Sequence, residues 1–135
     1  MTKVSFHQKV ILINAEGKIL ALKASYKNLR WDLPGGAVEI PEEHEIALRR
    51  EVQEEAGIEI KNIIPLQVSS GHNKETDEYV LFIGFQAEAL STTITLSSEH
   101  TEYKWVTKEE FLQLDATPYL IEFVKDYYNS QNLQK

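Results

Sequence analysis

Hydrophobic and polar positions along the chain first predict a strand and a returning strand. From Val4 to Ile13, apolar and polar residues alternate and then merge into an apolar run, a pattern typical of a strand that enters the centre of a sheet. Asn14 to Gly17 has the composition of a turn. Ile19 to Leu22 therefore predicts the second strand of a hairpin, which we expect to end at Lys23.

The middle of the chain predicts one well-formed helix. Residues 43–56 are good helix formers, and Leu48, Val52 and Ala56 recur every four residues, which predicts one buried stripe. Gly57 follows where a left-handed helix cap is expected. Before this helix, residues 24–30 predict a polar loop, and residues 31–36 predict a short extended piece that ends in two glycines.

The remainder predicts further strands and a closing helix. Residues 58–70 and 79–90 favour strands joined as a second hairpin, and residues 103–106 favour a short strand. Thr107 and Glu110 form a capping-box signature for a short helix that runs to Leu114. A final helix opens at Thr117-Pro118 with one apolar face. Strands on both sides of a central helix predict an α/β fold with a mixed sheet covered on both faces.

Composition narrows the class of protein. With 135 residues, of which 42% are hydrophobic and 26% charged, we expect residues 1–135 to form a single domain with its own core. The formal net charge of -7 opposes stable binding to nucleic acid, because a phosphate backbone would be repelled. A phosphate-bearing ligand is therefore expected to bind together with a metal ion.

Cysteine content and apolar run lengths bear on the compartment. The sequence contains no cysteine, which excludes disulfides and thiolate metal ligands and is compatible with a reducing compartment. Its longest apolar runs, at 10–13 and 79–85, are too short to span a bilayer, and the first residues lack the apolar core of a secretory signal. We expect a cytoplasmic protein with no membrane partner.

The predicted helix is rich in carboxylates at helical spacing. Glu51, Glu54 and Glu55 stand at i, i+3 and i+4, where like charges repel by a few tenths of a kcal/mol per pair, roughly. A hard divalent cation such as Mg2+ or Mn2+ would offset that repulsion. Arg50 is placed to pair with Glu42 and so to hold the approach loop against the helix.

The run GGAVEIPEEHEIALRREVQEEAGI resembles the Nudix box, and the preceding WDLPGG resembles its usual lead-in. The rest of the chain is more loosely similar to small MutT-like Nudix domains. This resemblance implies an α/β/α sandwich, with a mixed sheet flanked by helices. It also implies hydrolysis of a nucleoside diphosphate linked to another moiety, with Mg2+ or Mn2+ as cofactor.

The resemblance also implies roles for individual residues. Glu54 and Glu55 correspond to the principal metal ligands, together with the backbone carbonyl of Gly35. Glu51 corresponds to a residue that binds metal or deprotonates the attacking water, while Arg50 and Glu42 correspond to orienting partners. The chain departs from the family pattern beside the first box glutamate, where Pro41 and Glu43 replace the usual glycine and a Ser, Thr or Asp cap.

Residues outside the box are further candidates. Glu99 and Glu102 lie in a predicted loop where family members place an additional acid that serves as metal ligand or base. Lys23, Arg30 and Gly36 are expected to contact the substrate. His100 is more simply a surface residue. A base-stacking ring could come from a set of aromatic residues for which core packing is the favoured interpretation: Phe6, Tyr79, Phe82, Phe85 and Trp105.

The expected activity is a pyrophosphohydrolase acting on a small nucleotide, with (deoxy)nucleoside triphosphates favoured over ADP-ribose and sugar nucleotides. The alternative is a nucleotide-binding regulatory module without turnover, although every box glutamate is present. A diphosphate isomerase on the same fold would need cysteine chemistry. The sequence leaves open the number of metal ions, the general base (Glu51 or a loop acid), and whether the protein is a monomer or a homodimer.

Overall fold

The strand β1 (Lys3–Ile13) organises the sheet, because it pairs with three other strands. It is antiparallel to β2 and β4 and parallel to β6 along its whole length. The computed structural model describes residues 3–25 and 29–133, so part of the predicted loop at 24–30 lies outside the described residues. The remaining strands are β2 (Ile19–Ala24), β3 (Trp31–Asp32), β4 (Gly35–Ala37), β5 (Ile60–Asn73), β6 (Glu78–Ala89) and β7 (His100–Val106).

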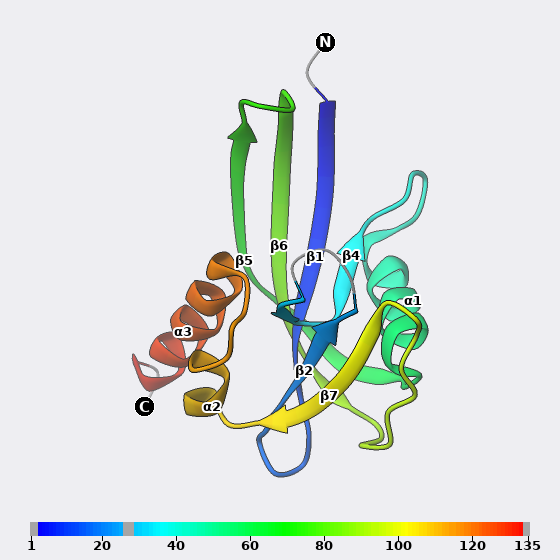
Figure 1. Ribbon diagram of the computed structural model, residues 1–135, viewed down its shortest axis with the longest axis vertical. Helices are drawn as coiled ribbons and strands as arrows, with labels where there is room; N and C mark the ends of the chain where they lie inside the picture. Colours follow the sequence, from blue (N-terminus) through cyan, green and yellow to red (C-terminus); the bar gives the residue numbers. More distant parts are fainter. Residues whose placement is uncertain (1–2, 26–28, 134–135) are drawn as a thin grey trace.

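Three helices cover the mixed sheet, whose main strand order is β3-β2-β1-β6-β5 with β7 added beside β2. They are α1 (His44–Ala56), α2 (Lys108–Leu112) and α3 (Pro118–Leu133). The helix α1 lies on one side of the sheet, and α2 and α3 lie on the other (Figure 1). The α/β/α sandwich expected from the sequence is confirmed.

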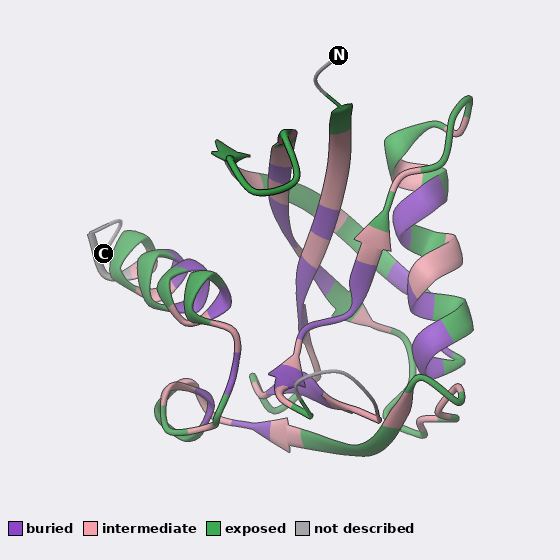
Figure 2. Cartoon of the chain, turned by 45° about the horizontal axis from the view of Figure 1, so that its top comes forward, coloured by how far each residue is buried: buried purple, intermediate pink, exposed green. Residues whose placement is uncertain are grey.

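Strand alternation explains the two layers. In β1, Val10 and Leu12 point to one face and pack in a cluster with Leu48 and Val52 of α1. Ile11, between them, points to the opposite face and packs in the cluster that contains α2 and α3. Figure 2 shows the buried residues of α1 as a stripe along the helix. The predicted stripe of Leu48, Val52 and Ala56 is fully buried.

The ends of α1 follow from local chemistry. Gly57 adopts the predicted left-handed conformation, with φ of 70°, and its N–H donates to the Gln53 carbonyl. Glu43 occupies the N-cap position but its side chain makes no capping hydrogen bond. The departure from the family pattern at this position thus leaves the helix start without a side-chain cap.

Several predicted boundaries were wrong by a few residues. The second hairpin pairs out to Asn73 and Glu78, so β5 extends further than the predicted residue 70 and starts later than 58. The strand β2 continues past Lys23 to Ala24, and β7 begins at His100, because these two strands pair antiparallel. The capping box of Thr107 and Glu110 is present, but α2 ends at Leu112.

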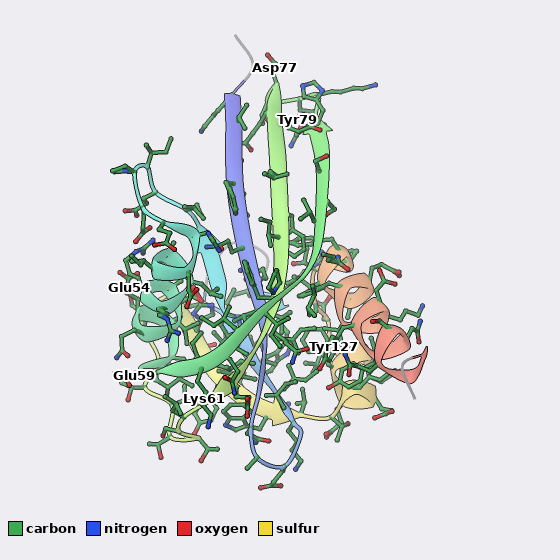
Figure 3. All side chains as sticks on the ribbon, turned by 180° about the vertical axis from the view of Figure 1, so that it is seen from behind. Glu54, Glu59, Lys61, Asp77, Tyr79 and Tyr127 are labelled. Atoms are coloured by element: carbon green, nitrogen blue, oxygen red, sulfur yellow. The ribbon has the colours of Figure 1, made fainter. Side chains whose placement is uncertain are left out.

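The far ends of β1, β5 and β6 project beyond both helix layers (Figure 1). Asp77 and Tyr79 lie at the tip of this projection (Figure 3). Exposed apolar residues such as Val4 and Val68 lie on these strands. Among the described residues, α1 to α3 are each too short or too polar to cross a membrane.

Gly84 of β6 lies directly against Phe123 of α3. A Cβ atom added there would lie 2.4 Å from two ring atoms of the buried Phe123. Gly84→Ala should therefore lower the free energy of unfolding by about 1–3 kcal/mol through overpacking. Gly71→Ala is the matched control, since a Cβ atom at Gly71 has no heavy atom within 4 Å. Chemical denaturation of both variants checks this, and equal midpoints would contradict it.

Candidate functional site

The end of α1 is tied to the sheet through a buried carboxylate. The Gly35 N–H donates to Glu55 Oε1 at 3.2 Å, and Glu55 is only 5% exposed. Gly35 has φ of 138°, and a Cβ atom there would lie 2.1 Å from the Gln8 carbonyl oxygen. Both facts require glycine at this position. The glycine therefore lets β4 come close enough to meet Glu55.

Gly36 makes room for a second carboxylate. A Cβ atom at Gly36 would lie 2.8 Å from Glu51 Oε2, so the Glu51 carboxylate packs directly against the Gly36 backbone. Gly36 was expected to contact the substrate. That role stays a prediction, and the structure adds that Gly36 lets Glu51 lie close to the glycine pair that precedes the helix.

Arg50 is the counter-charge on the outer side of the helix. It donates from Nε and Nη2 to the two carboxylate oxygens of Glu42, at 2.7 and 2.9 Å. This bidentate pair holds the approach loop against α1, as predicted. Arg50 also lies 3.1 Å from Glu51 and 3.2 Å from Glu54. One guanidinium thus compensates three carboxylates.

The pKa values divide the acids into two groups. Burial raises the pKa of Glu55 to about 8, although Lys9 and the Gly35 N–H act in the opposite direction. Burial also raises the pKa of Glu51, partly offset by Arg50. The hydrogen bonds from Arg50 lower the pKa of Glu42, and the same bonds raise the pKa of Arg50. Glu55 therefore lacks sufficient positive charge, whereas Glu51 is buried but keeps Arg50 as a partner.

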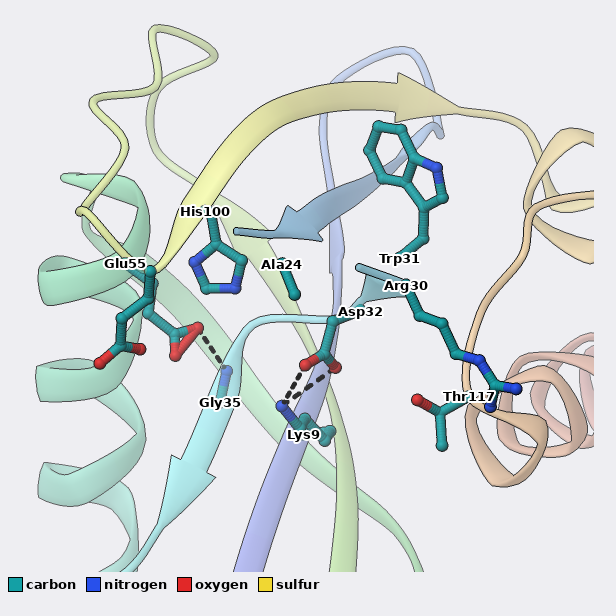
Figure 4. A pocket seen from close by; sticks show the side chains of 10 residues that line it. Lys9, Ala24, Arg30, Trp31, Asp32, Gly35, Glu55, His100 and Thr117 are labelled. Atoms are coloured by element: carbon teal, nitrogen blue, oxygen red, sulfur yellow. Dashed lines mark hydrogen bonds and ion pairs between the residues drawn. The ribbon is translucent and has the colours of Figure 1, made fainter. Parts of the chain in front are cut away.

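A polar cavity of about 200 Å³ opens beside Glu55 (Figure 4). Lys9 projects into its wall from β1, and its Nζ lies 3.0 and 3.1 Å from the two carboxylate oxygens of Asp32. The full lining consists of Lys9, Ala24, Arg30, Trp31, Asp32, Gly35, Glu55, Glu99, His100 and Thr117.

Lys9 and Asp32 were not predicted to belong to the site. Burial alone would lower the pKa of Lys9, but the carboxylates of Asp32 and Glu55 outweigh it and raise that pKa. A sequence signal existed: Lys9 lies on the same strand face as Ile11, which is fully buried. A lysine on the core-facing side of a strand indicates a position where a charged side chain is buried.

The candidates outside the box divide between the cavity and the surface. Glu99 and His100 line the cavity, and burial lowers the pKa of His100. Glu102 instead forms an ion pair with Lys23 at 3.4 Å, and both side chains lie outside the cavity lining. Arg30 lines the cavity and also lies 3.7 Å from Asp115. The roles expected for these five residues stay predictions.

The donor atoms fit a hard divalent cation, although the carboxylates do not all converge as expected. Within residues 3–25 and 29–133, no three acidic or histidine side chains already meet at one point. The reason is that Arg50 holds Glu54 outward, at 59% exposure, while Glu55 turns inward to Gly35. Carboxylate oxygens of Glu51, Glu54 and Glu55 are nevertheless the ligand type that Mg2+ and Mn2+ prefer.

Fold and site together define an α/β/α enzyme domain in which one carboxylate-bearing helix borders a polar cavity. The family model described as NUDIX domain matches residues 7–127. A MutT-like protein of Streptomyces ambofaciens is 30% identical over 111 residues, which cover 82% of this chain and 69% of that protein. The nucleoside triphosphatase NudI of Salmonella arizonae is 32% identical over 95 residues, 64% of this chain and 67% of that protein.

Structural similarity agrees with these matches. The MutT protein of Methanosarcina mazei superimposes with a TM-score of 0.80 at 27% identity, and the match covers 96% of each chain. The chain belongs to the Nudix family, and it is a Nudix pyrophosphohydrolase of the MutT-like kind.

The buried Glu55 makes stability depend on pH. Its pKa is about 8 in the folded protein and 4.5 ordinarily, so between these values the folded state keeps a proton that the unfolded state has lost. The free energy of unfolding of the metal-free protein should therefore fall as pH rises from about 4.5 to 8. Glu55→Gln should flatten this fall, as measured by urea denaturation in a chelating buffer.

Glu45→Gln is the control for that measurement. Glu45 lies on the same helix, is exposed, and pairs with Arg49 outside the cavity. Its replacement should leave the pH slope of the wild type in place. A wild-type slope in Glu55→Gln would show that the buried carboxylate is not the group responsible.

Proposed function

We propose that the protein hydrolyses a pyrophosphate bond of (deoxy)nucleoside triphosphates or related small nucleotides, with Mg2+ or Mn2+ as cofactor. The observation that carries this proposal is the buried Glu55 carboxylate, which borders a polar cavity with too little positive charge around it. The name of the NudI relative, a nucleoside triphosphatase, supports nucleoside triphosphates over ADP-ribose or sugar nucleotides. We take residues 1–135 as one domain that acts alone or as a homodimer.

The metal would be held principally by Glu54 and Glu55, with the Gly35 carbonyl as a backbone ligand, and Glu51 would be either a further ligand or the base. When bound, the metal would neutralise phosphoryl oxygens and lower the pKa of the attacking water. For Glu54 to take part, its carboxylate must leave Arg50, a move that costs little because the pair is exposed. Arg50 stays in place because its two bonds to Glu42 are independent of Glu54.

Glu51 is the proposed acceptor of the proton from water. It packs on Gly36, and burial disfavours its charged form, so its affinity for a proton exceeds that of an ordinary glutamate. Glu99 is the alternative base and a further candidate ligand, because it lines the cavity. Glu102 is the weaker candidate of the two loop acids, since its carboxylate pairs with Lys23.

The site would bind the charged part of the substrate with few cations. Arg30 lines the cavity and is the proposed phosphate contact, while Lys23 is a weaker one because it lies outside the lining. The acidic surroundings favour a phosphate group that arrives with its metal rather than alone. A regulatory module without turnover would bind the same ligand, so hydrolysis itself has to be measured.

Replacing the box carboxylates should abolish turnover. In an assay of phosphate or pyrophosphate release from nucleoside triphosphates, ADP-ribose and sugar nucleotides, Glu51→Gln, Glu54→Gln and Glu55→Gln should each lower kcat by a factor of about 100 or more. Glu45→Gln should retain wild-type kcat. Release should require Mg2+ or Mn2+ and stop in a chelating buffer.

Metal affinity separates the two candidate bases. If Glu51 is the base, Glu51→Gln loses turnover but still binds Mn2+, whereas Glu99→Gln retains most turnover. The reverse pattern would assign the base to Glu99. Tight metal and nucleotide binding by the wild type, without release of any product, would refute the hydrolase proposal in favour of the binding module.

A further inference from the structure

Lys9 and Asp32 form an ion pair inside the fold that the proposed chemistry does not use. The Lys9 side chain is 12% exposed and that of Asp32 is 29% exposed, and both line the cavity beside Glu55. The Lys9 Nζ also donates to the Leu33 carbonyl at 3.3 Å, while Asp32 Oδ1 accepts from the Leu33 N–H at 2.7 Å. The pair is thus held in one fixed arrangement.

Folding alone gives little reason for this pair. Replacing a buried ion pair by apolar residues is often neutral or stabilising, because two charges no longer have to leave water. The neighbouring position on the same strand face, Ile11, is apolar and fully buried. The segment around Asp32 is already anchored by backbone pairing of β3 with β2 and of β4 with β1. A recognition role explains why charges are kept here.

A second cavity lies further along β1. It has a volume of about 300 Å³ and is lined by His7, Ser69, Ser70, Gly71, Val80, Phe82 and Tyr119. His7 and Lys9 lie on the same face of β1. Burial raises the pKa of Tyr119, and the nearby charges of Lys9 and Asp32 act on that pKa in opposite directions. The ion pair therefore lies between the carboxylate helix and a more apolar space.

That space suits a planar ring. Phe82 and Tyr119 meet edge to face with their ring centres 5.2 Å apart, and they supply an aromatic wall. Phe82 packs in the core cluster on the α3 side of the sheet and also lines this space, whereas Phe85 packs in the core beneath α1. A heterocycle lying against this wall would bring its polar edge to the ion pair.

We propose that Lys9 and Asp32 are the specificity-determining pair of the site and bind the polar edge of the substrate's base. This inference rests on the proposed function. Lys9 offers donors and Asp32 offers acceptors, so their ligand must present an acceptor and a donor side by side. A phosphate group has acceptors alone and would face the Asp32 carboxylate. The amide or amidine edge of a nucleobase meets the requirement, and the adjoining aromatic wall favours it over ribose hydroxyls.

The test compares substrate selectivity in Lys9→Met, Asp32→Asn and the wild type. Triphosphates of the common bases, in ribo and deoxy forms, are assayed with Mn2+. Each variant should lower kcat/KM for the preferred base about tenfold or more, mainly through KM, with smaller losses for poor substrates. Selectivity among bases should therefore narrow, while Asp32→Asn keeps the Mn2+ affinity of the wild type.

Lys3→Met is the matched control. Lys3 lies on the same strand, pairs with Glu78, and has a side chain that is 76% exposed. It should leave selectivity unchanged. Asp32→Asn keeps the side-chain volume, so it preserves the test if Lys9→Met does not fold. Equilibrium titration with the nucleoside monophosphate products gives a second measure of base preference that needs no turnover.

Four results would overturn the inference. Equal losses on every base, or weakened Mn2+ binding by Asp32→Asn, would assign the pair a structural role. A change confined to the ratio of ribo to deoxy substrates would assign it to the sugar. If the wild type hydrolyses no nucleotide, the proposed function fails, and unaltered product binding in the variants would then overturn the inference separately.

Discussion

The burial of the Glu55 carboxylate between α1 and the sheet is the constraint on which the site depends. A carboxylate removed from water needs hydrogen bonds and positive charge, or else it holds a proton. Here the sheet supplies one backbone N–H, from Gly35, and one nearby cation, Lys9. These two are insufficient, which is why the pKa reaches about 8. The shapes of β4 and of the adjoining loop follow from delivering that N–H.

The other charges are arranged around this inner acid in two separate sets. Arg50 serves the outer carboxylates, so it stabilises the approach loop without neutralising Glu55. Lys9 is shared between Asp32 and Glu55 and does not fully satisfy the latter. The start of α1 is fixed independently, because Gln8 donates from Nε2 to the His44 carbonyl at 2.9 Å. The helix is thus held firmly while its inner carboxyl group keeps a proton below about pH 8.

Sequence reasoning succeeded where a feature depends on neighbours in the chain. The buried stripe of α1 follows from helical spacing, its cap follows from the glycine at position 57, and the Arg50–Glu42 pair follows from opposite charges close in the chain. The hairpins follow from alternation and turn residues. It failed where the feature depends on distant pairing. The parallel pairing of β1 with β6 joins residues 75 positions apart in the chain, as in Lys3 with Glu78. That pairing, with β4 on the other side, decides which residues border Glu55.

The same limit explains why half of the site was not predicted. Lys9 looks like an ordinary polar residue in an alternating strand until β4 is placed beside it, since Lys9 pairs with Gly35 in register. Glu99 and Glu102 look equivalent in sequence, yet the antiparallel register of β7 with β2 sets Glu102 opposite Lys23 and leaves Glu99 at the cavity. Register is a property of the assembled sheet, and a shift of one residue exchanges its two faces.

The buried carboxyl group of Glu55 lowers the stability of the fold and is at the same time a proposed ligand for a divalent ion. An apolar residue in place of Glu55 would remove the cost of burying a carboxylate, and an extra cation would satisfy it. Either change would make a more stable sheet and a poorer site for a divalent ion. Because Arg50 is held by Glu42, it cannot move inward to fill that role. The arrangement therefore leaves positive charge to be supplied from outside the chain, at the point where the helix meets the cavity.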